Sequence, residues 1–250
     1  MPPLLADPLI RDLGVVDDGS RLVDLRDHGL RVVPTAPPLP LGASDNLGRM
    51  PLSSLPSARV LPRLPHVEAR ETVAERLVAA DACLPHGVRL LVVEGLRLLG
   101  AQIAIHDAYR RRLATAHPDL SDDEIAALTS RFVAPPSVGP HVSGAAVDVT
   151  LVGPDGPLDL GTAIDATPEQ SGGACYFDSA AISSEARHNR SVLATVLGEA
   201  GLVNYPTEWW HWSFGDRYWA HVTGRPFAIH GPIHPRNTPG NVERTPVATR

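Results

Sequence analysis

The sequence predicts an α+β fold, in which helices pack on one central sheet that is mostly antiparallel. Helical and strand patterns alternate early in the chain, whereas long irregular stretches separate the later strands. The chain has 250 residues and is 43% hydrophobic, which suffices for one sizeable core. We therefore expect an N-terminal arm at 1–40, a single domain at 41–229 and a C-terminal tail at 230–250.

Four segments have the apolar periodicity of helices, namely 67–84, 99–118, 121–133 and 186–202. In the second of them, Ile103, Ala104 and Ala108 are expected to form the apolar face. Ser121 and Glu124 have the spacing of a capping box, which marks the start of the third helix. Residues 1–66 are interrupted repeatedly by proline, so we expect loops and short strands there.

Three segments are predicted to be strands. A β-branched apolar run between two glycines occupies 86–95, and a clean alternation of apolar with other side chains occupies 145–152. Asp148 in this second strand points to the side opposite the valines. The aromatic segment at 208–215 is expected to open the third strand.

Composition and charge argue against several function classes. A net charge of −6 and a pI near 6 disfavour nucleic acid or an anionic membrane as the partner. No apolar run reaches the roughly 18 residues of a membrane-spanning helix, and we see no signal peptide, so we expect a cytoplasmic protein. The oligomeric state stays open, a homo-oligomer included.

Cys83 and Cys175 lie outside any C-x-x-C pair, which argues against a cysteine-rich zinc site. One disulfide bridge between these two cysteines stays open.

The pentapeptide EWWHW at 208–212 contains three of the four tryptophans and encloses Glu208 and His211. Such surroundings suggest polar groups held in a dry, rigid place. Histidine is the commonest metal ligand, and a catalytic zinc site needs three protein ligands and one open position for water. Because the chain has eleven histidines, His211 is informative only if it has partners.

Candidate partners occur in GPHVSGAAVDVTL at 139–151. A regular strand would place His141 and Asp148 on opposite faces, but a sharp turn at Gly144 would bring the two side chains together. Asp148 could also be a strand-edge charge or a turn cap. A carboxylate in a strand this apolar nevertheless needs a cation.

The pattern H-x-x-G-x-A-x-D, followed far downstream by E-x-x-H, resembles the zinc signature of the M15 metallopeptidases. It is made here by His141, Gly144, Ala146, Asp148, Glu208 and His211. The form EWWH is similar to that of the D-alanyl-D-alanine dipeptidases of the VanX type. The resemblance covers about 40–220 and extends to SDNLGR at 44–49 and LGTAID at 160–165.

The resemblance implies a Hedgehog/D,D-peptidase-like fold and one zinc ion per chain, held by His141, Asp148 and His211. The zinc ion would lower the pKa of a bound water toward about 7. Glu208 would then be the general base, and Asp165 would accept the free ammonium of the substrate. The other interpretation of Asp165 is a loop or helix-cap residue.

The family also uses an arginine just after a strand, in a form like D/E-G-Y-R-P, and two positions compete for it. We select Arg97, at the end of the strand at 86–95, because Arg110 lies within a predicted helix and should point to solvent. This sequence has Leu96 and Leu98 where the family has Tyr and Pro. Gly139 stands where the family often has a substrate-binding Ser.

These residues together favour a zinc-dependent dipeptidase that cleaves D-Ala-D-Ala or a close relative, in peptidoglycan metabolism or glycopeptide resistance. Its partner would be a small dipeptide. The alternatives are an M15 D,D-carboxypeptidase, a dipeptidase of other stereochemistry, or a zinc-stabilised binding module without catalysis. Retention of Glu208 and Arg97 argues against the binding module, since a structural zinc site needs neither.

Overall fold

A computed structural model describes residues 4–34 and 65–233. Its central sheet has the strand order β2-β4-β5-β8-β7, and β6 also pairs with β5. β2 and β4 are parallel, and the other pairs of this sheet are antiparallel. The strands are β2 (Arg31–Val32), β4 (Arg89–Glu94), β5 (Ala146–Gly153), β6 (Gly156–Pro157), β7 (Val203–Asn204) and β8 (His211–Ser213). The predicted α+β class with a mostly antiparallel sheet is confirmed.

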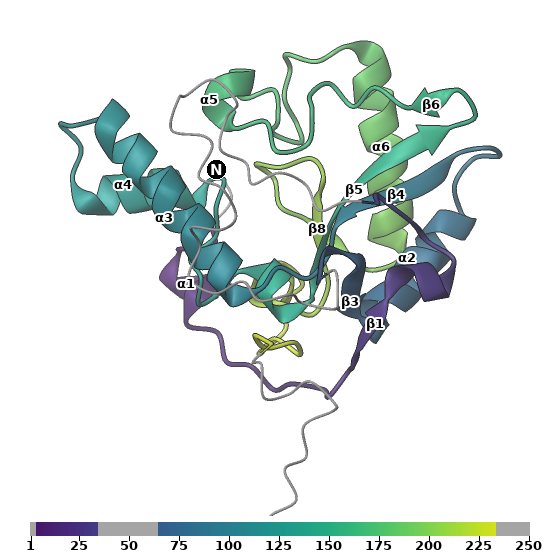
Figure 1. The fold of residues 1–250 in the computed structure, drawn as a ribbon, viewed down its shortest axis with the longest axis horizontal. Helices are drawn as coiled ribbons and strands as arrows, with labels where there is room; N and C mark the ends of the chain where they lie inside the picture. Colours follow the sequence, from purple (N-terminus) through teal and green to yellow (C-terminus); the bar gives the residue numbers. More distant parts are fainter. Residues whose placement is uncertain (1–3, 35–64, 234–250) are drawn as a thin grey trace, which may run out of the picture.

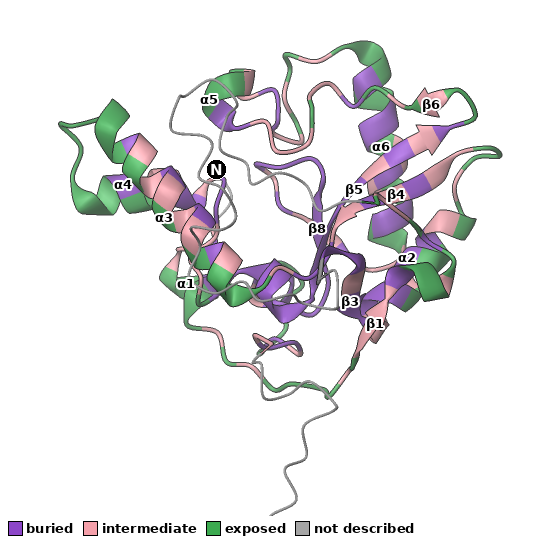
Figure 2. Ribbon diagram, viewed as in Figure 1, coloured by how far each residue is buried: buried purple, intermediate pink, exposed green. Residues whose placement is uncertain are grey.

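Two helices cover one face of this sheet (Figure 1). α2 (Glu71–Ala82) and α6 (Ser184–Glu199) contact each other, and their buried side chains join those of the strands in one hydrophobic cluster. Buried and exposed residues alternate along both helices (Figure 2), as amphipathic helices on a sheet require. α3 (Leu99–Ala116) and α4 (Asp122–Ser130) pack on each other at the other side of the molecule, away from α2 and α6 (Figure 1).

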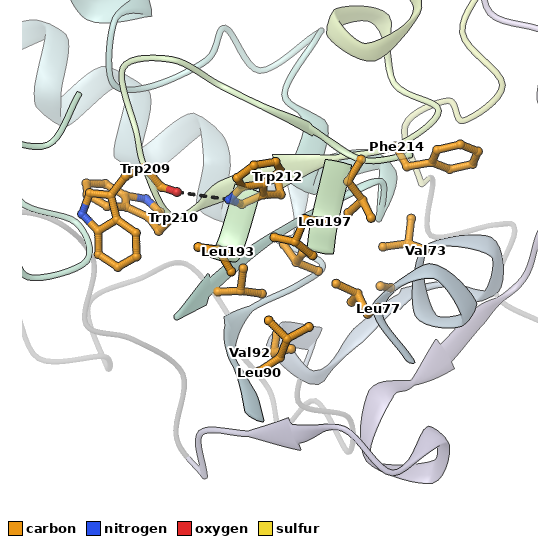
Figure 3. Packing of buried hydrophobic residues seen from close by; sticks show 14 of the residues in the cluster. Val73, Leu77, Leu90, Val92, Leu193, Leu197, Trp209, Trp210, Trp212 and Phe214 are labelled. Carbon is orange, nitrogen blue, oxygen red and sulfur yellow. Dashed lines mark hydrogen bonds between the residues drawn. The ribbon is translucent and has the colours of Figure 1, made fainter. Parts of the chain in front are cut away.

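The register between β5 and β8 decides what each face of the sheet carries. Val147 pairs with Trp212, and Asp148 pairs with His211. Because side chains alternate along a strand, Val147 and Trp212 share the face covered by helices. Figure 3 shows Trp212 in the same hydrophobic cluster as Leu193 of α6. Asp148 and His211 therefore share the opposite face.

The predicted helices are present, with shifted ends. The third, α4, begins with the expected capping box of Ser121 and Glu124. The first begins at Glu71 rather than at 67, because the preceding residues form a short 3-10 helix and a strand. The expected apolar face of α3 is wrong, since Ile103 is 43% exposed. The buried face of α3 consists of Gln102, Ile105, Tyr109 and Leu113.

Residues from the expected N-terminal arm pack onto the rest of the chain wherever the structure describes them. β1 (Leu22–Asp24) pairs with β3 (Glu68–Arg70), and β2 joins the central sheet beside β4. The buried guanidinium of Arg70 donates to Asp17 and to the carbonyl of Gly231, so it ties both ends of the described chain together.

The remaining short elements are α1 (Pro8–Arg11), α5 (Pro168–Ser171), α7 (Arg217–Val222) and the 3-10 helices η1 (Leu25–His28), η3 (Pro65–Val67) and η4 (Pro140–Ser143). Cys83 is exposed and Cys175 is buried, and both are free thiols. Among the residues that the structure describes, no helix combines the length and the apolarity needed to cross a membrane.

The packing of α2 on the sheet can be tested with two adjacent residues. Leu77 is fully buried, whereas Val78 is 39% exposed. Leu77→Ala should lower the free energy of unfolding by about 2–5 kcal/mol, because it removes buried methyl groups and leaves a cavity. Val78→Ala should change it by no more than about 0.5 kcal/mol. Urea denaturation of both variants measures the difference, and equal effects would contradict this packing.

Candidate metal centre

Three buried side chains from three elements converge on one point. His141 lies in η4, Asp148 in β5 and His211 in β8, and each is at most 5% exposed. The Nε2 atom of His141 lies 3.0 Å from His211 Nδ1 and 3.3 Å from Asp148 Oδ1. His211 Nδ1 lies 3.2 Å from Asp148 Oδ1. The structure thus brings together the three residues that the sequence predicts as metal ligands, and they form a group able to hold a metal ion.

The spacing of these three atoms fits tetrahedral coordination of zinc. Zinc binds imidazole nitrogen and carboxylate oxygen at about 2.0–2.2 Å, so the ligand atoms of a tetrahedral site lie about 3.3–3.5 Å apart. The observed distances of 3.0–3.3 Å are close to these values. Two neutral imidazole nitrogens this close would repel through their lone pairs unless a proton or a cation lay between them. The donor set therefore suits a divalent cation.

The backbone around His141 fixes which ring nitrogen faces the site. His141 Nδ1 donates to the carbonyl of Gly95 at 2.7 Å, so the lone pair of the neutral ring is on Nε2. The amide of Arg97 donates to the carbonyl of His141 at 3.1 Å. Gly144 ends η4 with a φ of +66°, and a Cβ atom there would lie 2.8 Å from the Leu22 side chain. The predicted sharp turn at this glycine is therefore present.

Glu208 lies in the turn that leads into β8. Its Oε2 atom lies 3.7 Å from His211 Nδ1, and the residue is 7% exposed. The side-chain amide of Asn204 holds the turn by donating to the carbonyls of Glu208 at 2.9 Å and His211 at 3.0 Å. A carboxylate is thereby fixed beside the converging ligand atoms.

The indole rings support this turn from behind. Trp209, Trp210 and Trp212 are buried, and none of them lines the cavity beside the three ligands. Trp209 Nε1 donates to Thr162 Oγ1 at 2.8 Å, and Trp212 Nε1 donates to the carbonyl of Trp209 at 3.1 Å, the bond drawn in Figure 3. The tryptophans therefore hold Glu208 and His211 in place through the backbone of the turn, while other side chains form the wall of the site.

Arg97 follows β4 and lines the same cavity as the three ligands. Its Nε atom donates to Glu94 Oε1 at 2.8 Å, its Nη2 atom donates to the second oxygen, and its Nη1 atom donates to Gln102 Oε1 at 3.0 Å. Burial alone would lower the pKa of Arg97, but the Glu94 carboxylate outweighs burial and raises it. The guanidinium is therefore charged and held on both sides.

Arg110, the competing arginine, lies elsewhere. It is on α3 and donates to Asp122 at 3.0 Å, with 38% of its side chain exposed. It does not line the cavity. The structure thus places Arg97 and Arg110 as the sequence predicts.

Asp165 also lines the cavity, and its backbone has a φ of +63°, the one positive φ of a non-glycine residue in the part of the chain described. Such a conformation persists only where surrounding contacts impose it. The chain on either side of Asp165 is held by Arg190 of α6, because this buried side chain donates to four carbonyls before and after it. They belong to Leu160, Ala174, Tyr176 and Phe177.

Carboxylates outnumber cations around the site. Burial, and then the charges of Asp148 and Asp165, raise the pKa of Glu208 well above its usual value. Burial, and then Asp148 and Glu94, raise the pKa of Asp165 to about 7. Burial raises the pKa of Asp148, but His141 and His211 outweigh burial and lower it. A divalent cation would offset this excess of negative charge.

Residues 60–228 match the M15 peptidase family, which is described as D-Ala-D-Ala dipeptidase. The match spans more than half of the chain and includes every site residue considered above. The chain belongs to the M15 peptidase family.

A relative of this M15 peptidase is a D-alanyl-D-alanine dipeptidase of Synechocystis sp., which is 29% identical over 240 residues. The similarity covers 88% of this chain and 90% of the relative. It therefore extends beyond the segment matched by the family.

Two solved structures are also similar to this M15 peptidase. One is the vancomycin resistance D,D-pentapeptidase VanY in complex with Zn(II), at 16% identity, covering 65% of this chain and 82% of that chain with a TM-score of 0.36. The other is VanYB in complex with D-alanine-D-alanine, at 17% identity, covering 68% and 88% with a TM-score of 0.38. At TM-scores below 0.5, neither similarity supports a conclusion about this chain.

Several residues that shape the site of this M15 peptidase are not predicted from the sequence. Glu94, Gln102 and the carbonyl of Gly95 orient Arg97 and His141. Glu94 and Gly95 stand directly before Leu96 and Arg97 in the D/E-G-Y-R-P pattern, so that pattern could have pointed to them. The segment at 44–49, also part of the resemblance, lies outside the described residues.

Proposed function

We propose that this M15 peptidase is a zinc-dependent dipeptidase that hydrolyses D-Ala-D-Ala or a closely related dipeptide. The observation that carries the proposal is the convergence of His141, Asp148 and His211, with Glu208 beside the ligand atoms. Family membership supports the peptidase chemistry. We further infer a role in peptidoglycan metabolism or glycopeptide resistance, on a small dipeptide in the cytoplasm.

His141 Nε2, Asp148 Oδ1 and His211 Nδ1 would hold one zinc ion, which supplies a Lewis acid and a more acidic water. Glu208 is the general base of the proposal. Its carboxylate accepts a proton from the attacking water and later donates it to the leaving amine. The rigid turn that carries Glu208 supports this role, because proton transfer needs a base at a fixed distance.

Arg97 stabilises the negative charge that develops on the scissile carbonyl oxygen. Its bidentate pairing with Glu94 fixes the plane of the guanidinium, and the hydrogen bond to Gln102 fixes its position along the cavity wall. A donor aimed in advance at the developing charge lowers the barrier more than one that must reorganise.

Asp165 binds the free ammonium of the dipeptide. The carboxylate lies on the same cavity, and an incoming ammonium would stabilise its charged form. A longer or acylated substrate would leave this buried group without a charged partner, which favours dipeptides over peptidoglycan chains.

The proposed ligand set predicts metal stoichiometry. Wild type should bind one zinc ion per chain, whereas His211→Ala should lose most of it because two protein ligands bind zinc far more weakly than three. His188→Ala, at an exposed position of α6, is the control and should bind as wild type does. Elemental analysis after dialysis measures the content. Undiminished zinc in His211→Ala would show that the ion binds elsewhere.

Substitutions of the two arginines should differ in their effect on kcat. Arg97→Ala should lower kcat by about 10²–10³-fold with zinc content unchanged, because it removes a charge that acts on the transition state. Arg110→Ala should leave kcat near the wild-type value and change stability by no more than roughly 0.5 kcal/mol. Steady-state kinetics on D-Ala-D-Ala separates them. The opposite ranking would mean that the arginine is misassigned.

The proposed ammonium contact predicts discrimination between two substrates. D-Ala-D-Ala should have a kcat/KM roughly 10- to 100-fold above that of N-acetyl-D-Ala-D-Ala, since a hydrogen bond to a charged group contributes about 1.5–3 kcal/mol. Asp165→Asn should reduce this ratio, while Asp155→Asn, in an exposed turn after β5, should retain it. Equal rates of wild type on both substrates would favour the carboxypeptidase.

A further inference from the structure

We propose that Leu5 is a specificity-determining residue of this peptidase. Its isobutyl side chain forms part of the apolar lining of the cavity and restricts the substrate to small side chains. The inference rests on the proposed function, because it concerns the cavity in which that function places the dipeptide.

The cavity is lined by two chemically different sets of side chains. The metal-binding group, Arg97, Asp165 and Glu208 form the polar part of the lining. The rest of the lining is mainly apolar and includes Leu5, Ile105, Phe132, Val133 and Tyr205. Charged groups of a peptide belong beside the polar residues, and the apolar residues are suited to a side chain of the substrate.

The main chain at Leu5 is anchored where it meets this wall. The Leu5 amide donates to the Tyr205 hydroxyl at 3.3 Å, and that hydroxyl donates to the carbonyl of Ser130 at 2.8 Å. The amide of Ala6 donates to Ser130 Oγ at 3.0 Å. Leu5 is 2% exposed, so the segment that carries it cannot leave the wall without breaking these contacts.

The available space is small. The cavity volume is about 30 Å³, and one water needs roughly 10–15 Å³ by the same measure. A methyl group can replace such waters, whereas a branched or aromatic side chain needs the space that Leu5 occupies. Leu5 therefore contributes to the size limit of the cavity.

A purely structural role for Leu5 makes a different prediction. Leu5 packs with Ile10, Val138, Tyr205 and Tyr218 in a hydrophobic cluster separate from the main core. If packing were its only role, Leu5→Ala would lower stability and change the rates on all substrates alike. If Leu5 limits size, the variant changes the ratio between substrates.

The experiment compares kcat/KM of the zinc-loaded full chain for D-Ala-D-Ala, D-Ala-D-Leu and D-Leu-D-Ala. Leu5→Ala should raise the rate on one leucine peptide relative to D-Ala-D-Ala by roughly tenfold or more, because removed methyl groups leave room for those of the substrate. Which peptide responds identifies the side chain that faces Leu5. Leu9→Ala is the matched control, from the same segment but 69% exposed, and should keep the wild-type ratios.

A second variant keeps the test decisive if Leu5→Ala does not fold. Tyr205→Phe retains the ring and removes the hydroxyl that anchors Leu5, so it should shift the same ratio in the same direction. Folded variants with wild-type ratios would overturn the inference while leaving the proposed function intact. Wild type that cleaves none of the three peptides would overturn the proposed function itself.

Discussion

The pairing of β5 with β8 is the constraint on which the rest of the structure depends. One register sets Val147 against Trp212 on the helix-covered face and Asp148 against His211 on the other. A slip of one residue would exchange the faces, putting a carboxylate into the hydrophobic core and an indole into the site. The packing of α2 and α6 therefore specifies the geometry of the candidate metal site, although neither helix supplies one of its three residues.

A second constraint is the balance of charge on the open face of the sheet. Buried ions cost free energy unless partners and hydrogen bonds compensate them. Arg97 and Glu94 compensate each other through a bidentate contact, and Gln102 completes the coordination of the guanidinium. The other carboxylates are left with too few cations, which is the electrostatic reason that a divalent ion suits this face. The proposed metal ion and the proposed ammonium of the substrate would both offset the same excess of negative charge.

The sequence predicts the parts of the site that depend on short-range pattern. The period-two alternation at 145–152 and the turn at Gly144 suffice to bring His141 and Asp148 together, and the strand end suffices to place Arg97. Gln102 is missed because it is a polar residue on the buried face of α3, where hydrophobic periodicity points to apolar residues. It is buried because it bridges Arg97 and the carbonyl of Ala134.

β1 and β2 are too short to show a period-two pattern in the sequence, and the strands with which they pair are distant in sequence.

The contact between Leu5 and Tyr205 also has a consequence for the order of assembly. These residues are 200 positions apart, and bringing such distant segments together is slow because loop-closure entropy must be lost first. On the ribosome, at about 5–20 residues per second, the N-terminal segment waits roughly 10–40 s before residue 205 is made. Asp148 on β5 and His211 on β8 also come from the later part of the chain, and the segment around Leu5 stays without its partner Tyr205 until that part is synthesised. The cavity wall and the metal-binding group therefore become complete at nearly the same stage of synthesis.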